Sequence, residues 1–302
     1  GPGAAFWIFA GALLGMSIKF VEATLAVKYR KFNLDGSVSG GPMHYIAHGL
    51  TKKKMRWLGQ PLSVLFAILC IGGGITGGNM IQINQTAHQI VFITGGTNSF
   101  LHGYTWVVGL VAAVLIGLVI VGGIKSIAKV TTILTPTMCL LYIVSGLIVI
   151  GANFMHIPHA IMLILREAFH PTAVAGGVFG TIIIGLRRSV QSNEAGTGAA
   201  AIVYATAQTK EPVSQGFVAL LETFLTGVLC LFTSFAIVFS GACTQATKEI
   251  SGIELASNAF ESVISFFPII LSIIAVLFAL STLISWAYYG QKAWTFLLGE
   301  GK

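Results

Sequence analysis

The chain has 302 residues, of which 55% are hydrophobic and only 9% are charged, and its formal net charge is +7. A soluble domain carries roughly 25% charged residues, so this composition excludes a soluble globular protein and indicates a polytopic membrane protein. The basic excess is therefore no evidence for binding to nucleic acid, and we expect none among the partners.

Apolar windows of about 20 residues predict about seven membrane-spanning helices, because a helix that rises about 1.5 Å per residue needs that length to cross about 30 Å of hydrocarbon. We expect the second window, which is the longest, to be broken. In chain order the windows are 5–27, 57–92, 104–124, 130–152, 175–191, 213–240 and 266–289.

Lysine and arginine gather in alternate connections between these windows. The first connection alone holds Lys28, Arg30, Lys31, Lys52, Lys53, Lys54 and Arg56. By the positive-inside rule this side is cytoplasmic. We therefore expect residue 1 on the extracellular or periplasmic side of the plasma membrane and residue 302 in the cytoplasm.

The first window carries two signals of helix packing. Gly11 and Gly15 are four residues apart, and small residues at that spacing favour a close contact between helices over a role in ligand binding. Lys19 and Glu22 are three residues apart, so we expect them to share a helix face and to pair near the inner leaflet.

The second window contains a glycine-rich stretch followed by a row of amides. Five glycines lie between Gly72 and Gly78, and each weakens a helix by about 1 kcal/mol relative to alanine. Asn79, Gln82 and Gln85 then recur every three residues. These amides could hydrogen-bond a zwitterion, or they could bond between helices; the sequence leaves both open.

Residues 185–200, GLRRSVQSNEAGTGAA, place charges and small residues directly after an apolar run. Ionisable groups near the membrane are a functional hypothesis by default. The alternative is structural: Arg187 and Arg188 as cytoplasmic charges, and Ser192 and Asn193 as the cap of a following short helix. Further on, Glu222 is a lone carboxylate in a span and needs a partner or a proton.

The last window places hydroxyls on one helix face. Ser281 and Ser285 are four residues apart, as are Thr282 and Trp286. Hydroxyl and carbonyl oxygens suit a hard cation such as sodium, and the tryptophan could wall an apolar pocket. The alternative is a serine bonded back to its own helix beside an interfacial aromatic belt.

Several of these segments resemble, in order, the motifs of the alanine/glycine:cation symporter family. Ser189 and Gln191 depart from the family's pattern in the central motif. The matching residues of that motif are Gly185, Arg188, Ser192, Asn193, Glu194, Ala195, Gly196 and Gly198. Further similarity lies in residues 1–30, 40–46, 78–84 and 278–290.

The resemblance implies an all-α transporter of the LeuT-type inverted-repeat fold, with residues 1–302 forming one transmembrane domain. Its activity would be import of alanine or glycine coupled to sodium entry, with no cofactor, no catalytic residue and no resident metal. By motif, the substrate would contact Asn79, Gln82, Phe179, Ile183, Thr282 and Trp286. Ser281 and Thr282 would hold the cation, and Arg188, Ser192, Asn193, Glu194 and Gly196 would be the functional residues of the central motif.

In the family a glycine-rich broken helix precedes the segment that begins here at Gly1, and further helices follow Gly290. We therefore expect this chain to be a truncated part of the fold that does not transport alone. A proton-coupled permease of the same fold and a non-transporting structural subunit remain alternatives. An intramembrane enzyme is disfavoured, because the spans hold neither paired carboxylates nor a cluster of histidine and cysteine.

Overall fold

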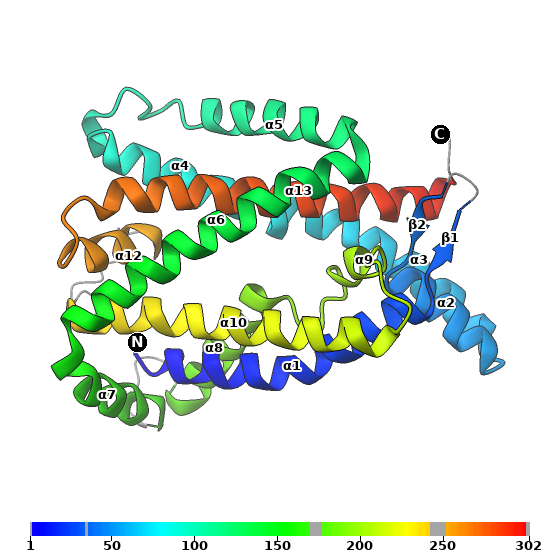
Figure 1. Cartoon of the computed structure of the whole chain (residues 1–302), viewed down its shortest axis with the longest axis horizontal. Helices are drawn as coiled ribbons and strands as arrows, with labels where there is room; N and C mark the ends of the chain where they lie inside the picture. Colours follow the sequence, from blue (N-terminus) through cyan, green and yellow to red (C-terminus); the bar gives the residue numbers. More distant parts are fainter. Residues whose placement is uncertain (1, 34–35, 170–176, 242–251, 300–302) are drawn as a thin grey trace. The chain divides into compact units, whose positions relative to one another are not determined.

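The computed structural model describes residues 2–33, 36–169, 177–241 and 252–299, and Figure 1 shows its helices. The predicted all-α class is confirmed, with one small addition: β1 (Lys31–Phe32) and β2 (Val38–Ser39) form an antiparallel hairpin in which Lys31 lies opposite Ser39. The LeuT-type arrangement stays a prediction.

In the described part of the chain, five helices are long and apolar enough to cross a membrane: α1 (Ala4–Lys28), the continuous helix Arg56–Ile93, α6 (Gly123–Ala152), α10 (Pro212–Phe239) and α13 (Phe267–Leu298). The other two predicted spans coincide with shorter helices, α5 (Trp106–Val121) and α8 (Gly177–Asn193). The count of seven spans therefore stays a prediction.

The helix Arg56–Ile93 changes its winding at the glycine-rich stretch instead of breaking. It consists of α3 (Arg56–Gly73), a π-helical segment η1 (Gly74–Met80) and α4 (Ile81–Ile93). Glycine has little intrinsic preference for the α-helix, so this stretch can widen by one residue per turn without unwinding. Asn79 lies inside the π-helical segment.

The shorter helices follow the local chemistry of the sequence. Helix α2 (Pro42–Lys52) begins with a proline, which suits the first position of a helix, after Gly41 at a φ of 104°. Helix α7 (Ile157–Phe169) is amphipathic and buries Ala160, Ile164 and Ala168 on one face. The remaining short elements are η2 (Gly96–Asn98), η3 (Phe154–His156), α9 (Ala201–Tyr204) and α12 (Gly252–Glu261).

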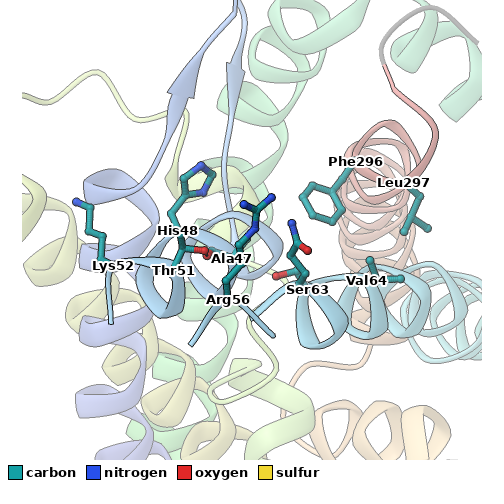
Figure 2. Close-up of a pocket in the computed structure, with 10 residues that line it drawn as sticks. Ala47, His48, Thr51, Lys52, Arg56, Ser63, Val64, Phe296 and Leu297 are labelled. Carbon is teal, nitrogen blue, oxygen red and sulfur yellow. The ribbon is translucent and has the colours of Figure 1, made fainter. Parts of the chain in front are cut away.

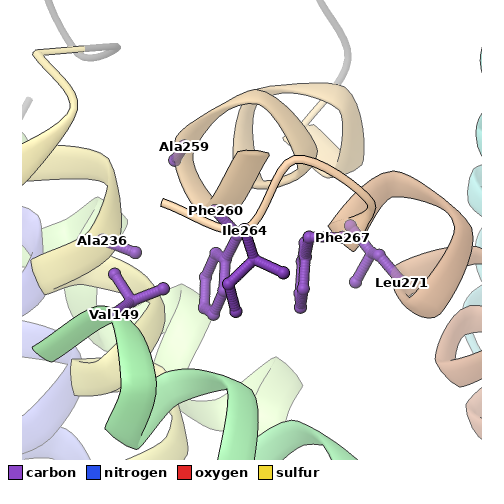
Figure 3. Close-up of a cluster of buried hydrophobic side chains, with 7 residues drawn as sticks. All are labelled: Val149, Ala236, Ala259, Phe260, Ile264, Phe267 and Leu271. Atoms are coloured by element: carbon purple, nitrogen blue, oxygen red, sulfur yellow. The ribbon is translucent and has the colours of Figure 1, made fainter. Parts of the chain in front are cut away.

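The described residues form two compact units. Unit 1 comprises residues 1–5, 76–173 and 229–285, and its core is a cluster shown in Figure 3. There Phe260 of α12 stacks on Phe267 of α13 with ring centroids 4.3 Å apart. Gln89 of α4 is buried and donates to Ser257 Oγ and to the Pro268 carbonyl, at 3.2 Å each, so α4, α12 and α13 are also joined by polar contacts.

Unit 2 comprises residues 6–75, 174–228 and 286–302, and it packs through small side chains. A Cβ atom added at Gly11 would lie 2.8 Å from Ser189 Cβ, and one at Gly15 would lie 2.9 Å from Ala195 Cβ. The predicted role in close helix packing is confirmed for Gly11, which meets α8, while Gly15 meets the loop that follows α8. Gly216 of α10 is equally tight, since its Cβ would lie 2.6 Å from Thr24 Oγ1 of α1.

The cysteines behave as small apolar residues where the structure describes them. Cys70 is buried, Cys139 and Cys230 are partly buried, and all three are free thiols. The fourth cysteine, Cys243, lies outside the described residues.

Candidate functional site: a buried charge cluster around residues 193–198

The loop that follows α8 is a tight turn built by its own side chains. Asn193 Oδ1 accepts the backbone N–H of Ala195 at 2.9 Å, and Asn193 Nδ2 donates to Ser189 Oγ at 3.2 Å. Glu194, Gly196 and Gly198 all have positive φ, at 54°, 86° and 74°. Asn193 therefore closes a turn within the loop and does not cap a helix, which corrects the structural alternative.

The carboxylate of Glu22, on α1, hydrogen-bonds to the backbone of this loop. Its Oε1 accepts the backbone N–H groups of Gly196 at 3.0 Å and Gly198 at 3.2 Å. The Glu22 side chain is only 7% exposed, and its Oε2 is buried with no hydrogen-bond partner among the described residues. Two backbone N–H groups aimed at one carboxylate oxygen form an anion site within the protein itself.

Lys19 supplies positive charge to the same region. Its side chain is 1% exposed, and its Nζ lies 5.4 Å from the centroid of the Tyr204 ring. The ammonium attracts both Glu22 and Glu194 electrostatically, and the direct pairing of Lys19 with Glu22 stays a prediction. A buried ammonium over an aromatic face is a cation–π contact.

Glu194 connects the loop to the last long helix. Trp286 Nε1 of α13 donates to Glu194 Oε1 at 3.1 Å. Burial raises the pKa of Glu194, Glu222 raises it further, and Lys19 and the Trp286 bond oppose that rise. The indole also lies against the glycines of α3, since a Cβ at Gly73 would be 3.5 Å from its Cζ3.

Glu222 is not isolated, which corrects its description as a lone carboxylate. The Tyr204 hydroxyl donates to Glu222 Oε2. Burial and the neighbouring Glu222 charge both raise the pKa of Tyr204, so this phenol stays a proton donor. Lys19, Glu22, Glu194, Glu222 and Tyr204 therefore form one group, here named the charge cluster.

Within unit 2 the structure brings three residues of the predicted site together. Glu194, Gly196 and Trp286 meet in the charge cluster, while Arg188 is exposed and bonds to Gln191 at 3.2 Å. Ser192 is also exposed, as are Phe179 and Ile183. Most of the surface of these two predicted pocket walls is therefore left uncovered by the described residues.

The remaining predicted residues belong to unit 1 and are half-buried there. They are Asn79, Gln82, Ser281 and Thr282. Asn79 Oδ1 is buried and accepts no hydrogen bond from the described residues. Ser285 Oγ bonds back to the Ser281 carbonyl at 3.0 Å, which is the structural alternative for that serine.

Sequence reasoning missed the convergence of α1, α10 and the loop after α8. The available signals were the ionisable residues Lys19, Glu22 and Glu222 inside apolar spans, because such groups need one another or water. Nothing in the spacing pairs Glu22 with glycines that lie 174 and 176 residues further along the chain.

Five long apolar helices in the described residues, the first of which buries Lys19 and Glu22, define a multi-pass membrane protein. The sequence model of the Sodium:alanine symporter family matches residues 1–302. The chain belongs to this family. It is accordingly a multi-pass plasma-membrane protein and not an enzyme.

Curated relatives are similar over nearly the whole chain. The sodium/alanine symporter AgcS of Methanococcus maripaludis is 36% identical over 99% of this chain and 64% of its own length. The probable sodium/glutamine symporter GlnT of Bacillus subtilis is 36% identical over 98% of this chain and 59% of its own. The putative sodium/proton-dependent alanine carrier YrbD of B. subtilis is 33% identical over 96% of this chain and 60% of its own. The chain thus spans about three fifths of the length of these relatives.

Proposed function

We propose that the protein imports a small neutral amino acid, alanine or glycine, together with sodium, through a LeuT-type fold. The family and the name of its sodium/alanine symporter relative support this substrate and this ion. The probable sodium/glutamine symporter among the relatives makes glutamine the main competing substrate.

The observation that carries the proposal is the buried side-chain oxygen of Asn79, which has no hydrogen-bond donor among the described residues. This amide lies in a π-helical segment, a distortion that is frequent at functional sites. A buried acceptor without a donor costs about 1–3 kcal/mol, so a donor from a ligand would be strongly favoured there. The α-ammonium group of an amino acid is such a donor.

The other proposed contacts follow the motifs. Gln82, Thr282 and Trp286 contact the amino acid, and Phe179 and Ile183 limit the size of its side chain. Ser281 and Thr282 contribute hydroxyl oxygens to the sodium ion. Glu194 is a positioning residue, because its bond to Nε1 fixes the indole of Trp286.

Uptake into proteoliposomes tests the proposal, with the chain and any residues that its gene adds on either side. We expect labelled alanine to accumulate on an inward sodium gradient and not on a choline gradient, with unlabelled glycine competing better than glutamine. Asn79→Leu should reduce uptake at least tenfold. Asn84→Leu is the matched control, since Asn84 is exposed on the same helix and should stay within twofold of the parent. Equal effects of the two variants would contradict the role of Asn79.

Proton coupling is the second candidate, favoured by the buried carboxylates of the charge cluster and by the name of the putative sodium/proton-dependent relative. In that case an inward proton gradient without sodium would drive alanine uptake, and sodium alone would not. A protein that binds no alanine under either gradient would instead be a structural subunit.

A further inference from the structure

Unit 2 contains a cavity of about 620 Å³ that the proposed transport site does not use. Figure 2 shows its lining: one face of α2 from Ala47 to Lys52, one face of α3 from Arg56 to Val64, and the end of α13 at Phe296 and Leu297. The four lining residues of α3 lie on one face of the helix, because they are spaced three or four residues apart or are neighbours on that face: Arg56, Gln60, Ser63 and Val64.

One end of the cavity is basic. Lys52 and Arg56 are exposed, and His48 and Thr51 lie beside them. With its amide oxygen turned toward Arg56, Gln60 accepts from Nε and Nη2 at 3.3 Å each, which fixes the guanidinium. No lining residue is acidic, and the sequence has no acidic residue between Asp35 and Glu167. The cavity therefore offers positive charge without an internal counter-ion.

The start of α3 adds to this preference for anions. Its first turn holds no acidic side chain, and no side chain caps its free N–H groups. The amino end of a helix carries partial positive charge, so an anion near Arg56 is favoured by the helix as well as by the side chains.

The other end of the cavity is apolar and continues along a membrane-spanning helix. Val64 lines it together with Phe296 and Leu297, and Leu65 and Ile68 lie exposed further along α3. Trp57, in the first turn of α3, is 74% exposed. An exposed tryptophan at the end of an apolar span is typical of the membrane interface. The basic end thus lies at the level of lipid headgroups and the apolar end at the level of acyl chains.

We propose that this cavity binds an anionic phospholipid of the leaflet on the basic, cytoplasmic side. The phosphate lies at Arg56, Lys52 adds positive charge at the same end of the cavity, and an acyl chain lies along Val64 and the exposed face of α3. Basic pockets beside membrane helices on the cytoplasmic side suit such headgroups. A soluble phosphate would leave the apolar wall without a contact, so the lipid explains both ends of the cavity.

Lipid titration of the detergent-purified protein, followed by native mass spectrometry, tests this site. The probes are phosphatidylglycerol, phosphatidylcholine with the same acyl chains, and glycerol 3-phosphate. We expect the protein to bind phosphatidylglycerol in preference to the other two. The double variant Lys52→Gln/Arg56→Gln should bind it about 30-fold more weakly, a change of about 2 kcal/mol.

Lys53→Gln/Lys54→Gln is the matched control, because it removes the same charge from two exposed lysines outside the lining. It should stay within about threefold of the parent protein. An equal loss in both double variants would overturn the proposal in favour of diffuse surface charge. Equal affinity for phosphatidylcholine or for glycerol 3-phosphate would overturn it as well.

A second variant keeps the proposal testable if the first cannot be purified. Val64→Glu places a carboxylate on the exposed apolar wall, where it opposes both the phosphate and the acyl chain. It should weaken binding of phosphatidylglycerol at least tenfold. Undiminished binding by this variant would exclude the apolar wall from the site.

Discussion

Replacing Lys19 with methionine should destabilise the protein by about 3–5 kcal/mol. Lys19 is almost completely buried and attracts Glu22 and Glu194, so its removal leaves buried carboxylates without their counter-charge. Methionine keeps most of the side-chain volume, and hence a cavity contributes little. The expected loss is electrostatic, and it should therefore depend on the charge of the neighbours.

Adding Glu22→Gln to Lys19→Met should recover part of this loss. Glutamine keeps an oxygen that can accept the N–H groups of Gly196 and Gly198, while it removes one unbalanced charge. Residues that interact in one network typically show coupling energies of 0.5–3 kcal/mol. We expect the double variant to be about 1–3 kcal/mol more stable than the sum of the two single changes.

Thermal unfolding in detergent measures these differences. A loss of 3–5 kcal/mol corresponds to a fall in Tm of roughly 6–10 °C for a chain of this size. The control is Lys28→Met at the exposed end of α1, which should change stability by less than about 0.5 kcal/mol. If Lys19→Met is as mild as Lys28→Met, or if the double variant equals the sum of its parts, the charge cluster does not act as one electrostatic unit.

Three further predictions concern other parts of unit 2. Burial, with a smaller contribution from Lys31, lowers the pKa of His44 from 6.5 to about 4, so the unfolded chain takes up a proton that the folded one does not. His44 should therefore contribute a loss of stability of about 3 kcal/mol as the pH drops from 6.5 to 4, and His44→Phe should remove this contribution from the difference between the two proteins in pH-dependent melting. Gly216→Ala brings a methyl group against Thr24 Oγ1 and should cost about 1–3 kcal/mol in the same assay; an unchanged Tm would mean that α10 shifts freely. Trp286→Phe removes the donor to Glu194 and should lower sodium-driven uptake about tenfold, whereas Trp294→Phe, at an exposed position, should leave it unchanged.

The helices could be predicted because the bilayer leaves few alternatives. A span must satisfy its own backbone, so a run of apolar residues predicts both its position and its type. The ends of the helices differ from the predicted windows. Helix α13 continues to Leu298, beyond the predicted end at residue 289, because Lys292 does not stop a helix whose next residues are apolar. The π-helical winding of η1 was also not predictable, since glycine content shows that a helix is weak and not how it deforms.

The charge cluster was only partly predictable. Periodicity placed Lys19 and Glu22 on one face of α1, but it could not show that Lys19 points to Tyr204 and Glu22 to a distant loop. Contacts between residues far apart in the chain leave no trace in a single sequence. The Glu194 motif could be found by resemblance, yet its bond to Trp286 needed the structure.

The hydrogen bonds to the Glu22 carboxylate explain why the loop after α8 contains glycine at positions 196 and 198. Gly196 and Gly198 adopt positive φ, which lets both N–H groups point to one oxygen. Glu194, two residues earlier, is also held at positive φ, a conformation that costs a non-glycine residue free energy and persists only when its surroundings fix it.

That fixed backbone is what aims Glu194 at the indole of Trp286. A substitution at Glu22 should therefore alter the environment of the Trp286 indole, although within the described residues the structure shows no direct bond between the two side chains. If Glu22→Ala releases the loop, the emission of Trp286, measured as the difference from a Trp286→Phe background, should shift toward that of a solvated indole. Glu22→Gln, which keeps the acceptor, should leave it in place. The same shift in both variants would mean that charge alone, and not the geometry of the two N–H bonds, orients the loop.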